Sequence, residues 1–299
     1  MPQDEAVVIA TFSRRMRLRL ATGGEVDARI KGKRLRPVCG DRVVAHAIDD
    51  ESDWLITAIL ERDNVLDRPN MRGKTEVLAA NVELLLVVAA GSPEPDWFIV
   101  DRYLCAAENM GVAAAVIYNK ADLDKDEAKL QSALHDYEQI DYPTVRCSAK
   151  TGSNLDEVQG IVLGKTGIFV GQSGVGKSSI INQLMGGEQQ RTATISDKTG
   201  EGRHTTVNSM MLTLPGGGEI IDSPGVRDYA PALQSAVQVI RGFREIEIAG
   251  HCCRFANCRH LREPGCAVKA AVEDQKIGAR RYESYRRLLA LTEKLDKKP

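Results

Sequence analysis

The hydrophobic positions divide the chain into three parts with different periodicities. In the first part, up to about residue 67, short apolar runs alternate with glycine and proline turns. They predict β-strands at 6–12, 16–20, 26–30, 42–47 and 54–60. Five short strands with basic loops are typical of the OB-fold, a small β-barrel. An unspecialised β domain with a solvated basic loop would show the same pattern, so composition leaves both open.

In the second part, apolar strands alternate with helical stretches. A polar segment rich in turn residues, 67–74, predicts a linker before it. Beyond the linker we expect strands at 82–90, 113–118, 144–147, 168–170, 210–214 and 219–221, and helices at 97–110, 126–140, 155–162 and 177–185. This alternation predicts a mainly parallel sheet with helices on both faces, and ligands bound at the carboxyl ends of the strands.

In the third part, after residue 226, a helix is expected at 232–243 and a long polar helix at 268–295, with a cysteine cluster between them. A small helical domain held together by a metal ion explains this pattern best. We therefore expect three domains: an OB-fold domain at 1–67, an α/β domain at 68–228 and a metal-binding helical domain at 229–299.

Length and charge narrow the class of protein. At 299 residues the chain is long enough for two or three domains. No apolar run approaches the roughly 18 residues of a membrane span. Asp4 and Glu5 stand where a secretory signal would be basic, so a cytoplasmic protein is expected. The net charge of −1 hides ten Lys/Arg against three Asp/Glu at 11–42, and nine against five at 268–299. Basic ends around an acidic middle favour a polyanionic partner.

A glycine-rich loop stands between a predicted strand and a predicted helix. Its residues are Gly171, Gln172, Ser173, Gly174, Val175, Gly176, Lys177 and Ser178, followed by Ser179. This is the context of a phosphate-binding loop, whose backbone N–H groups and helix N-terminus surround the phosphates. In that motif Lys177 bridges the β- and γ-phosphates and Ser178 ligates Mg²⁺. A nucleoside triphosphate site at 171–179 is expected.

Two earlier motifs predict which base is bound. The first is Asn119-Lys120-Ala121-Asp122, and the second is Ser148-Ala149-Lys150. A carboxylate at Asp122 can accept hydrogen bonds from guanine N1–H and N2–H₂, a pair of donors that adenine lacks. Asn119 would brace the loop, Lys120 would lie along the base, and the Ala149 N–H would meet guanine O6. Both motifs precede the phosphate loop, which is the reverse of the order in ordinary GTPases.

Two loops would sense the γ-phosphate. Asp222-Ser223-Pro224-Gly225 has the pattern of a switch II loop, in which Asp222 holds Mg²⁺ through water and the Gly225 N–H meets the γ-phosphate. The second loop is 202–206, between the phosphate loop and switch II. One of its threonines, Thr206 in preference to Thr205, would complete the Mg²⁺ coordination as switch I.

The residue that positions the attacking water is less obvious. Many GTPases carry glutamine after the switch II glycine, but this chain has Val226, which can neither donate nor accept a hydrogen bond. Slow intrinsic hydrolysis is therefore expected. His204 is the nearest candidate in the sequence to orient the water.

The cysteine cluster has the composition of a structural metal site. Cys253, Cys258, His260 and Cys266 supply three thiolates and one imidazole within fourteen residues. Four soft ligands suit a closed tetrahedral zinc site. Cys252 competes with Cys253 for the first ligand position, and His251 is a further possible substitute.

Together these motifs resemble the RsgA family of GTPases. Guanine motifs ahead of the phosphate loop, the valine after switch II, an N-terminal barrel and the C-terminal cysteine pattern carry the resemblance, which covers nearly the whole chain. It implies a circularly permuted GTPase domain between an OB-fold and a zinc domain, and Cys253 as the first zinc ligand. It also implies GTP hydrolysis stimulated by the small ribosomal subunit in late maturation, as a checkpoint or release step.

Circular permutation has a structural consequence. Switch II then stands at the exit of the GTPase domain, so that a movement at residues 222–226 on phosphate loss would pull directly on the zinc domain. We expect a monomer that binds ribosomal RNA mainly through phosphate contacts, with affinity falling as salt rises.

Two other readings stay open on sequence alone. One is an ATP-using phosphate-loop enzyme, such as a small-molecule kinase, with the guanine motif a coincidence. The other is a nucleic-acid-binding module whose GTPase fold is only a sensor. Intact Lys177, Ser178 and Asp222 argue against an inert fold.

Overall fold

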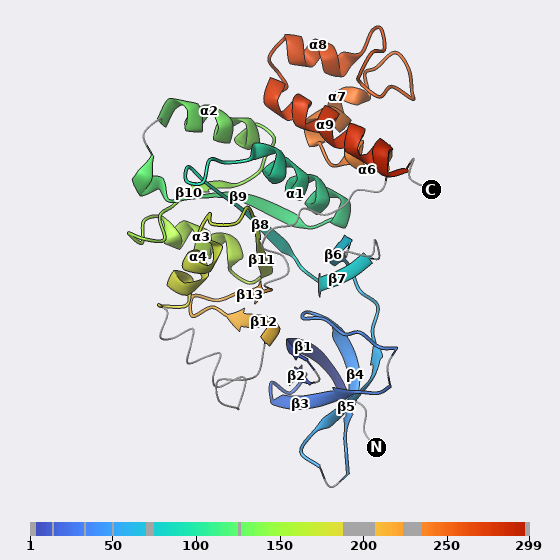
Figure 1. Cartoon of the computed structure of the whole chain (residues 1–299), viewed down its shortest axis with the longest axis vertical. Coiled ribbons are helices and arrows are strands. Elements are labelled where there is room, and N and C mark those ends of the chain that lie inside the picture. The colour runs from blue at the N-terminus through green and yellow to red at the C-terminus, as the bar shows by residue number, and fades with distance from the viewer. Residues whose placement is uncertain are drawn as a thin grey trace.

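The computed structural model describes residues 4–13, 15–32, 34–49, 51–69, 75–124, 127–187, 207–223 and 235–296. A β-barrel, a central α/β sheet and a group of helices follow one another along the chain (Figure 1). Among the described residues, no helix is both long and apolar enough to cross a membrane.

The barrel consists of five strands: β1 (Asp4–Phe12), β2 (Met16–Leu20), β3 (Glu25–Ile30), β4 (Arg42–Ala47) and β5 (Trp54–Ile59). They lie in the order β1-β2-β3-β5-β4, and β4 pairs again with β1 to close the barrel. Alternate side chains such as Val8, Leu18 and Ile56 fill the interior and are inaccessible to solvent. The predicted five-stranded barrel is confirmed, and each expected strand is present.

The central sheet contains β8 (Leu84–Ala90), β9 (Ala113–Asn119), β10 (Thr144–Arg146), β11 (Thr166–Gly171), β12 (Val207–Thr213) and β13 (Glu219–Asp222). Its order is β10-β9-β8-β11-β13-β12, and only β12 is antiparallel to its neighbour in this part. The carboxyl ends of the five parallel strands therefore meet at one edge, as expected of an α/β nucleotide-binding domain.

Helices cover both faces of this sheet. They are α1 (Trp97–Met110), α2 (Glu127–Glu138), α3 (Leu155–Val162) and α4 (Lys177–Leu184). Successive residues of β8 point to opposite faces: Leu85 packs in the core under α1 and α2, while Leu86 packs in the core with α3 and α4. Because both faces are buried, β8 has no polar residue, which is typical of a parallel sheet.

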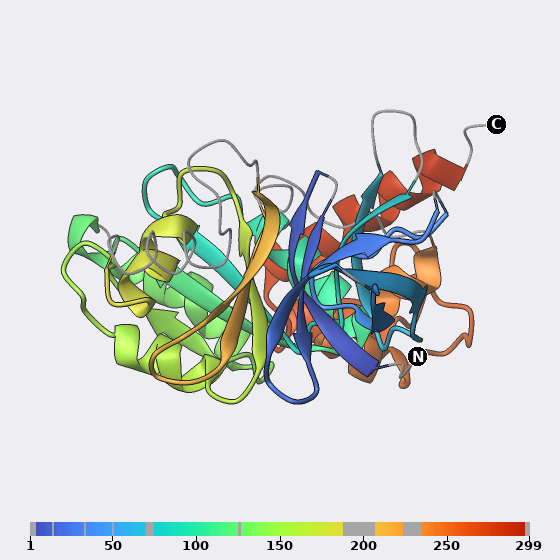
Figure 2. The ribbon, with the colours of Figure 1, turned by 90° about the horizontal axis from the view of Figure 1, so that it is seen from below.

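The barrel and the central sheet form one continuous β-structure. Strand β1 pairs antiparallel with β12, with Ala10 opposite Met210 and Thr11 opposite Ser209. This contact is visible where β1 runs beside β12 (Figure 2). Arg19 of β2 adds a bidentate ion pair with Glu219 of β13, with N–O distances of 2.5 and 3.0 Å.

The segment expected to be a linker is partly a β-ribbon. Strands β6 (Val65–Pro69) and β7 (Thr75–Ala80) pair antiparallel on either side of residues 70–74, which lie outside the described residues. Leu66 and Leu78 bury their side chains in the core of the central domain. These strands were not predicted because the segment 67–74 is polar, and the apolar residues that bury them, Leu66 and Leu78, lie outside it.

Within residues 235–296, the described C-terminal part, lie four helices: α6 (Ala236–Arg241), α7 (Arg244–Gly250), α8 (Ala267–Glu273) and α9 (Ala279–Asp296). The prediction of a single helix at 268–295 is wrong, because the helix is interrupted between α8 and α9. Gln275 adopts a left-handed φ of 60°, and the Lys276 N–H bonds back to the Ala271 carbonyl. A Cβ at Gly278 would lie 2.8 Å from a carboxylate oxygen of Asp136, so glycine allows close approach to α2.

Candidate nucleotide site and metal centre

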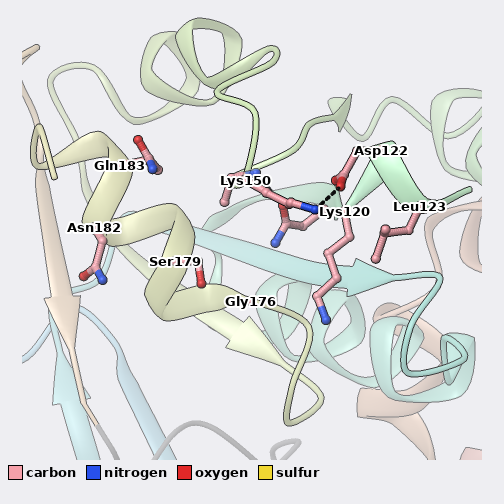
Figure 3. Close-up of a pocket in the computed structure, with 10 residues that line it drawn as sticks. Lys120, Asp122, Leu123, Lys150, Gly176, Ser179, Asn182 and Gln183 are labelled. Carbon is pink, nitrogen blue, oxygen red and sulfur yellow. Dashed lines mark hydrogen bonds and ion pairs between the residues drawn. The ribbon is translucent and has the colours of Figure 1, made fainter. Parts of the chain in front are cut away.

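Loops that follow β9, β10 and β11 meet at the carboxyl edge of the sheet. Together with α4 they surround a cavity of about 420 Å³. Figure 3 shows the two predicted guanine motifs on one side of this cavity and the phosphate loop with its helix on the other. Three motifs separated by up to about sixty residues in sequence therefore form a single site.

Asn119 connects all three motifs. Its side chain is buried, and its amide nitrogen donates to the Val175 carbonyl of the phosphate loop at 2.9 Å. Its carbonyl oxygen accepts the Ala149 N–H at 3.0 Å. The bracing role expected of Asn119 is thus visible in its contacts.

Lys120 and Asp122 lie on the cavity side of the first guanine motif. Lys120 has a left-handed φ of 63°, and its ammonium donates to the carbonyls of Ser92 and Gly174 at 2.6 and 2.7 Å. Asp122 accepts the Ser148 hydroxyl at 2.6 Å and lies 4.0 Å from the Lys150 ammonium (Figure 3). The two guanine motifs thus hold each other in place through their polar side chains.

The phosphate loop is wound around its own lysine. Gly171, Gly174 and Gly176 have φ values of 130°, 79° and 96°, which only glycine adopts without strain. The Lys177 ammonium donates to the carbonyls of Gly171 and Gln172 at 2.6 and 2.8 Å. Ser178 and Ser179 follow in the first turn of α4.

Asp222 ends β13, next to the strand that leads into the phosphate loop. Ile168 of β11 pairs with Ile221 of β13 in parallel register, so Asp222 and Gly171 lie at the same edge of the sheet. The Ser209 hydroxyl of β12 donates a buried hydrogen bond to the hydroxyl of the following Ser223 at 2.9 Å. Three other expected site residues and the candidate water-positioning residue lie outside the described residues: Thr205, Thr206, Gly225 and His204. Val226 does as well.

Three residues outside the predicted motifs also line the cavity. Asn182 and Gln183 stand one turn after Ser179 on α4, and Leu123 follows Asp122. The spacing of three and four residues from Ser179 places the first two on its face of the helix. The same spacing in the sequence could have predicted that Asn182 and Gln183 line the cavity beside Ser179.

The cysteine cluster comes together as expected. The candidate ligand atoms of Cys253, Cys258, His260 and Cys266 all lie within 4.8 Å of one another. The sulfurs of Cys253 and Cys266 are 3.9 Å apart, and each lies 3.5 Å from His260 Nδ1. Cys252 is exposed and lies outside the cluster. Of the two neighbouring cysteines, Cys253 is therefore the candidate for the first ligand position.

Neighbouring groups hold the cluster loop in shape. Burial opposes ionisation of Cys253, but hydrogen bonds from the Ala267 and Val268 N–H groups and from the Cys258 and Cys266 thiols together lower the pKa of this thiol. Burial likewise opposes ionisation of Glu263, yet its carboxylate accepts the N–H groups of Arg259, Leu261 and Arg262, which lower its pKa to about 2. From α9, the Tyr282 hydroxyl donates to the His260 carbonyl.

Comparison with known proteins identifies the family. The RsgA GTPase family model matches residues 59–231. The small ribosomal subunit biogenesis GTPase RsgA of Azotobacter vinelandii is 41% identical over 297 residues, which cover 97% of this chain and 86% of that protein. The chain belongs to the RsgA GTPase family. The Pseudomonas aeruginosa RsgA is 40% identical over 292 residues.

Two solved structures share the architecture of nearly the whole chain. YjeQ from Thermotoga maritima matches with a TM-score of 0.78 at 28% identity, over 97% of this chain and 99% of that one. YloQ, described as a circularly permuted GTPase, matches with a TM-score of 0.76 at 25% identity, over 100% and 97%. The circularly permuted GTPase fold is thus confirmed. Membership in a family of GTP hydrolases decides against the ATP-using enzyme and the inert sensor.

Proposed function

We propose that this chain is a GTPase of small ribosomal subunit biogenesis, which binds that subunit and hydrolyses GTP when stimulated by it in late maturation. The observation that carries the proposal is Asn119, which joins both guanine motifs and the phosphate loop around one cavity. Its relatives named as small ribosomal subunit biogenesis GTPases match nearly the whole chain. We further propose that it acts as a cytoplasmic monomer.

In this proposal the side chains of the cavity read guanine. The Asp122 carboxylate, oriented by Ser148, accepts guanine N1–H and N2–H₂. The Ala149 N–H, which donates to Asn119 Oδ1, is proposed to share its hydrogen with guanine O6 in a bifurcated bond. Lys120 lies along the base. Residues 171–179 hold the phosphates, and Lys177 stabilises charge on the transferred phosphoryl group.

The oxygen ligands for Mg²⁺ are proposed to be Ser178, Asp222 and Thr206. Hydroxyl and carboxylate oxygens are the donors that Mg²⁺ prefers, and the ion neutralises charge on the phosphates when bound. Gly225 is proposed to donate its N–H to the γ-phosphate, and His204 to orient the attacking water in place of the glutamine that Val226 replaces.

The distances among Cys253, His260 and Cys266 fit zinc, and Cys258 lies within 4.8 Å of all three. Tetrahedral bonds of about 2.3 Å to sulfur and about 2.0 Å to nitrogen place two sulfurs about 3.8 Å apart, and sulfur and nitrogen about 3.5 Å apart. The corresponding distances are 3.9 and 3.5 Å. We therefore propose one structural zinc ion held by Cys253, Cys258, His260 and Cys266, which supplies folding energy to the C-terminal domain.

Contact with ribosomal RNA is proposed to rely chiefly on the barrel. Part of the positive charge at 268–299 is neutralised within the protein, because Arg280 and Arg281 form ion pairs with Asp101. These two arginines are therefore not counted as RNA contacts. In the barrel, Lys31, Arg34 and Arg36 of the basic loop at 29–36 are exposed, and we propose that they supply the phosphate contacts. Such contacts make binding to the subunit weaken steeply as salt rises.

Guanine recognition is tested by Asp122→Asn. We expect GDP affinity to fall more than about 100-fold, because the amide cannot accept from both guanine donors. Affinity for xanthosine diphosphate should rise, since the new amide donates to the carbonyl at C2. This gain shows that the variant is folded. Unchanged GDP affinity would refute the assignment.

Stimulated hydrolysis is tested by measuring phosphate release with and without small ribosomal subunits. The parent should be slow alone and accelerated by the subunit, with less acceleration at higher salt. His204→Ala should lose the acceleration and keep its GDP affinity. A parent that hydrolyses GTP equally fast without the subunit would contradict the proposal.

Zinc binding is tested by metal content after exhaustive dialysis. The parent and Cys252→Ser should each retain one zinc per chain, whereas Cys253→Ser should lose it, because only Cys253 faces the other ligands. A chelator should lower the thermal stability of the parent and of Cys252→Ser alike. Equal zinc retention in both variants would rule out the ligand set.

A further inference from the structure

The guanine motif 119–122 is bracketed by two residues that bond to each other. Tyr118 is the residue before Asn119, and Asp124 stands two residues after Asp122. The Tyr118 hydroxyl donates to Asp124 Oδ1 at 2.8 Å. This side-chain hydrogen bond closes the loop at its base and so restricts the positions that Asp122 can take.

The same carboxylate reaches the second guanine motif. Arg146, the last residue of β10, places its guanidinium 3.5 Å from Asp124 Oδ2 and lies two residues before Ser148. The Asp124 side chain is only 10% exposed. Because the Asp124 carboxylate is shielded from water, its attraction to Arg146 is stronger than the attraction within an exposed ion pair. One carboxylate therefore joins the bases of both guanine-reading loops.

Close packing keeps the three groups together. A Cβ on Gly91, just after β8, would lie 2.7 Å from the Tyr118 hydroxyl and 2.9 Å from Asp124 Oδ1. The Tyr118 ring stacks on Trp97 of α1, with centroids 6.5 Å apart and planes 17° from parallel. Burial, followed by the hydrogen bond to Asp124, raises the pKa of Tyr118. The phenol thus stays protonated and donates to Asp124 at any physiological pH.

We propose that Tyr118, Asp124 and Arg146 form a clasp whose function is to position Asp122 and Ser148 for guanine. The clasp residues do not line the cavity, so they are positioning residues that act through Asp122. The inference rests on the proposed guanine site. It adds three residues, outside the four-residue guanine motif, on which selectivity for guanine depends.

The clasp has a signature that general destabilisation lacks. Hypoxanthine differs from guanine only by the missing 2-amino group, so the preference for GDP over IDP measures the Asp122 hydrogen bond to N2–H₂. Hydrogen bonds weaken steeply with misalignment. When the clasp opens, Asp122 loses alignment and the preference for GDP falls. Partial unfolding, in contrast, lowers both affinities by the same factor.

The experiment measures equilibrium affinities of the full chain for GDP and IDP in the parent, Tyr118→Phe and Asp124→Asn. Tyr118→Phe retains the ring against Trp97 and removes only the hydroxyl. Asp124→Asn can still accept from Tyr118 but loses its charge toward Arg146. We expect each variant to reduce the GDP-to-IDP affinity ratio by at least about fivefold, which is about 1 kcal/mol.

Tyr142→Phe is the matched control. Tyr142 is also buried, and its hydroxyl donates to a carboxylate, Glu108, at the same 2.8 Å, but it lies away from the cavity. This variant should keep the ratio of the parent. Equal ratios in Tyr118→Phe and Tyr142→Phe overturn the clasp. A parent that binds GDP and IDP equally well overturns the guanine site itself, and the clasp with it.

Discussion

Gly176 stands where the phosphate loop touches the first guanine motif. Its φ of 96° is open only to glycine, and a Cβ there would lie 2.3 Å from the Asn119 amide nitrogen. That nitrogen donates to the neighbouring Val175 carbonyl. The glycine is thus needed for two reasons, the left-handed backbone and the close approach of a side chain that holds the site together.

Replacing Gly176 with alanine should therefore damage the site more than the fold. We expect GDP affinity to fall at least about tenfold, or 1.4 kcal/mol, because Asn119 must move away from Val175. Gly23→Ala is the control, since Gly23 has a φ of 88° and nothing within 4 Å of its Cβ position. It carries the same backbone strain and should bind GDP like the parent. Nucleotide titration of both variants provides the measurement, and equal affinities would count against the role of Gly176.

At the scale of elements, α9 is fastened to α1 and α7 by buried charges. Arg281 is 1% exposed and donates to Asp101 of α1 at 2.8 Å and to both carboxylate oxygens of Glu245 of α7 at 2.8 and 3.0 Å. Asp101 also accepts the Tyr137 hydroxyl of α2 at 2.8 Å. Each buried charge has an opposite charge beside it, which offsets the cost of removing it from water.

Breaking this arrangement on one side should be costly. Arg281→Met leaves the buried Glu245 carboxylate without its arginine and leaves Asp101 with Arg280 alone, so we expect a loss of about 3–5 kcal/mol in the free energy of unfolding. Arg286→Met on the same helix removes a half-exposed partner of Glu283 and should change stability by less than about 0.5 kcal/mol. Denaturant unfolding followed by circular dichroism compares the two. Similar midpoints for both variants would show that the buried network contributes little.

At the scale of the whole molecule, the barrel is joined to the strand that leads to Asp222. Barrel strand β1 pairs with β12, which pairs with β13, and Arg19 pairs directly with Glu219 at the start of β13. Asp222 is the last residue of the same strand. A load on the barrel is therefore transmitted through backbone hydrogen bonds toward the proposed magnesium ligand.

Arg19→Met tests how firmly this joint is held. The pair is partly exposed, so its loss should weaken the joint by about 1 kcal/mol at most. Amide hydrogen exchange in β12 should then accelerate by up to about fivefold, while exchange in α1 stays unchanged. Arg17→Met serves as the control, because the Arg17–Asp27 pair lies within the barrel. Faster exchange in β12 for both variants would show a general weakening of the barrel instead.

Much of the architecture could be predicted from local pattern. The bounds of β2, β4, α1 and α3 match the expected ranges, because each follows from a short run of apolar periodicity between turn residues. The interruption between α8 and α9 could not be predicted in this way, because the sequence at 274–278 is compatible with a helix. Its cause is a tertiary contact, the close approach of Gly278 to Asp136. Likewise, the charge count at 268–299 did not reveal that Arg281 faces inward.

The candidate site was predictable to a similar extent. The sequence by itself determined the chemistry of the site: a phosphate loop, two guanine motifs and four soft metal ligands, each recognisable because its residues are close in the chain. The three-dimensional fold was needed to show which of these motifs touch and that Tyr118, Asp124 and Arg146 meet. The physical reason is that contacts such as Arg19 with Glu219 join residues 200 positions apart. Such contacts depend on how the sheet closes, which local pattern does not encode.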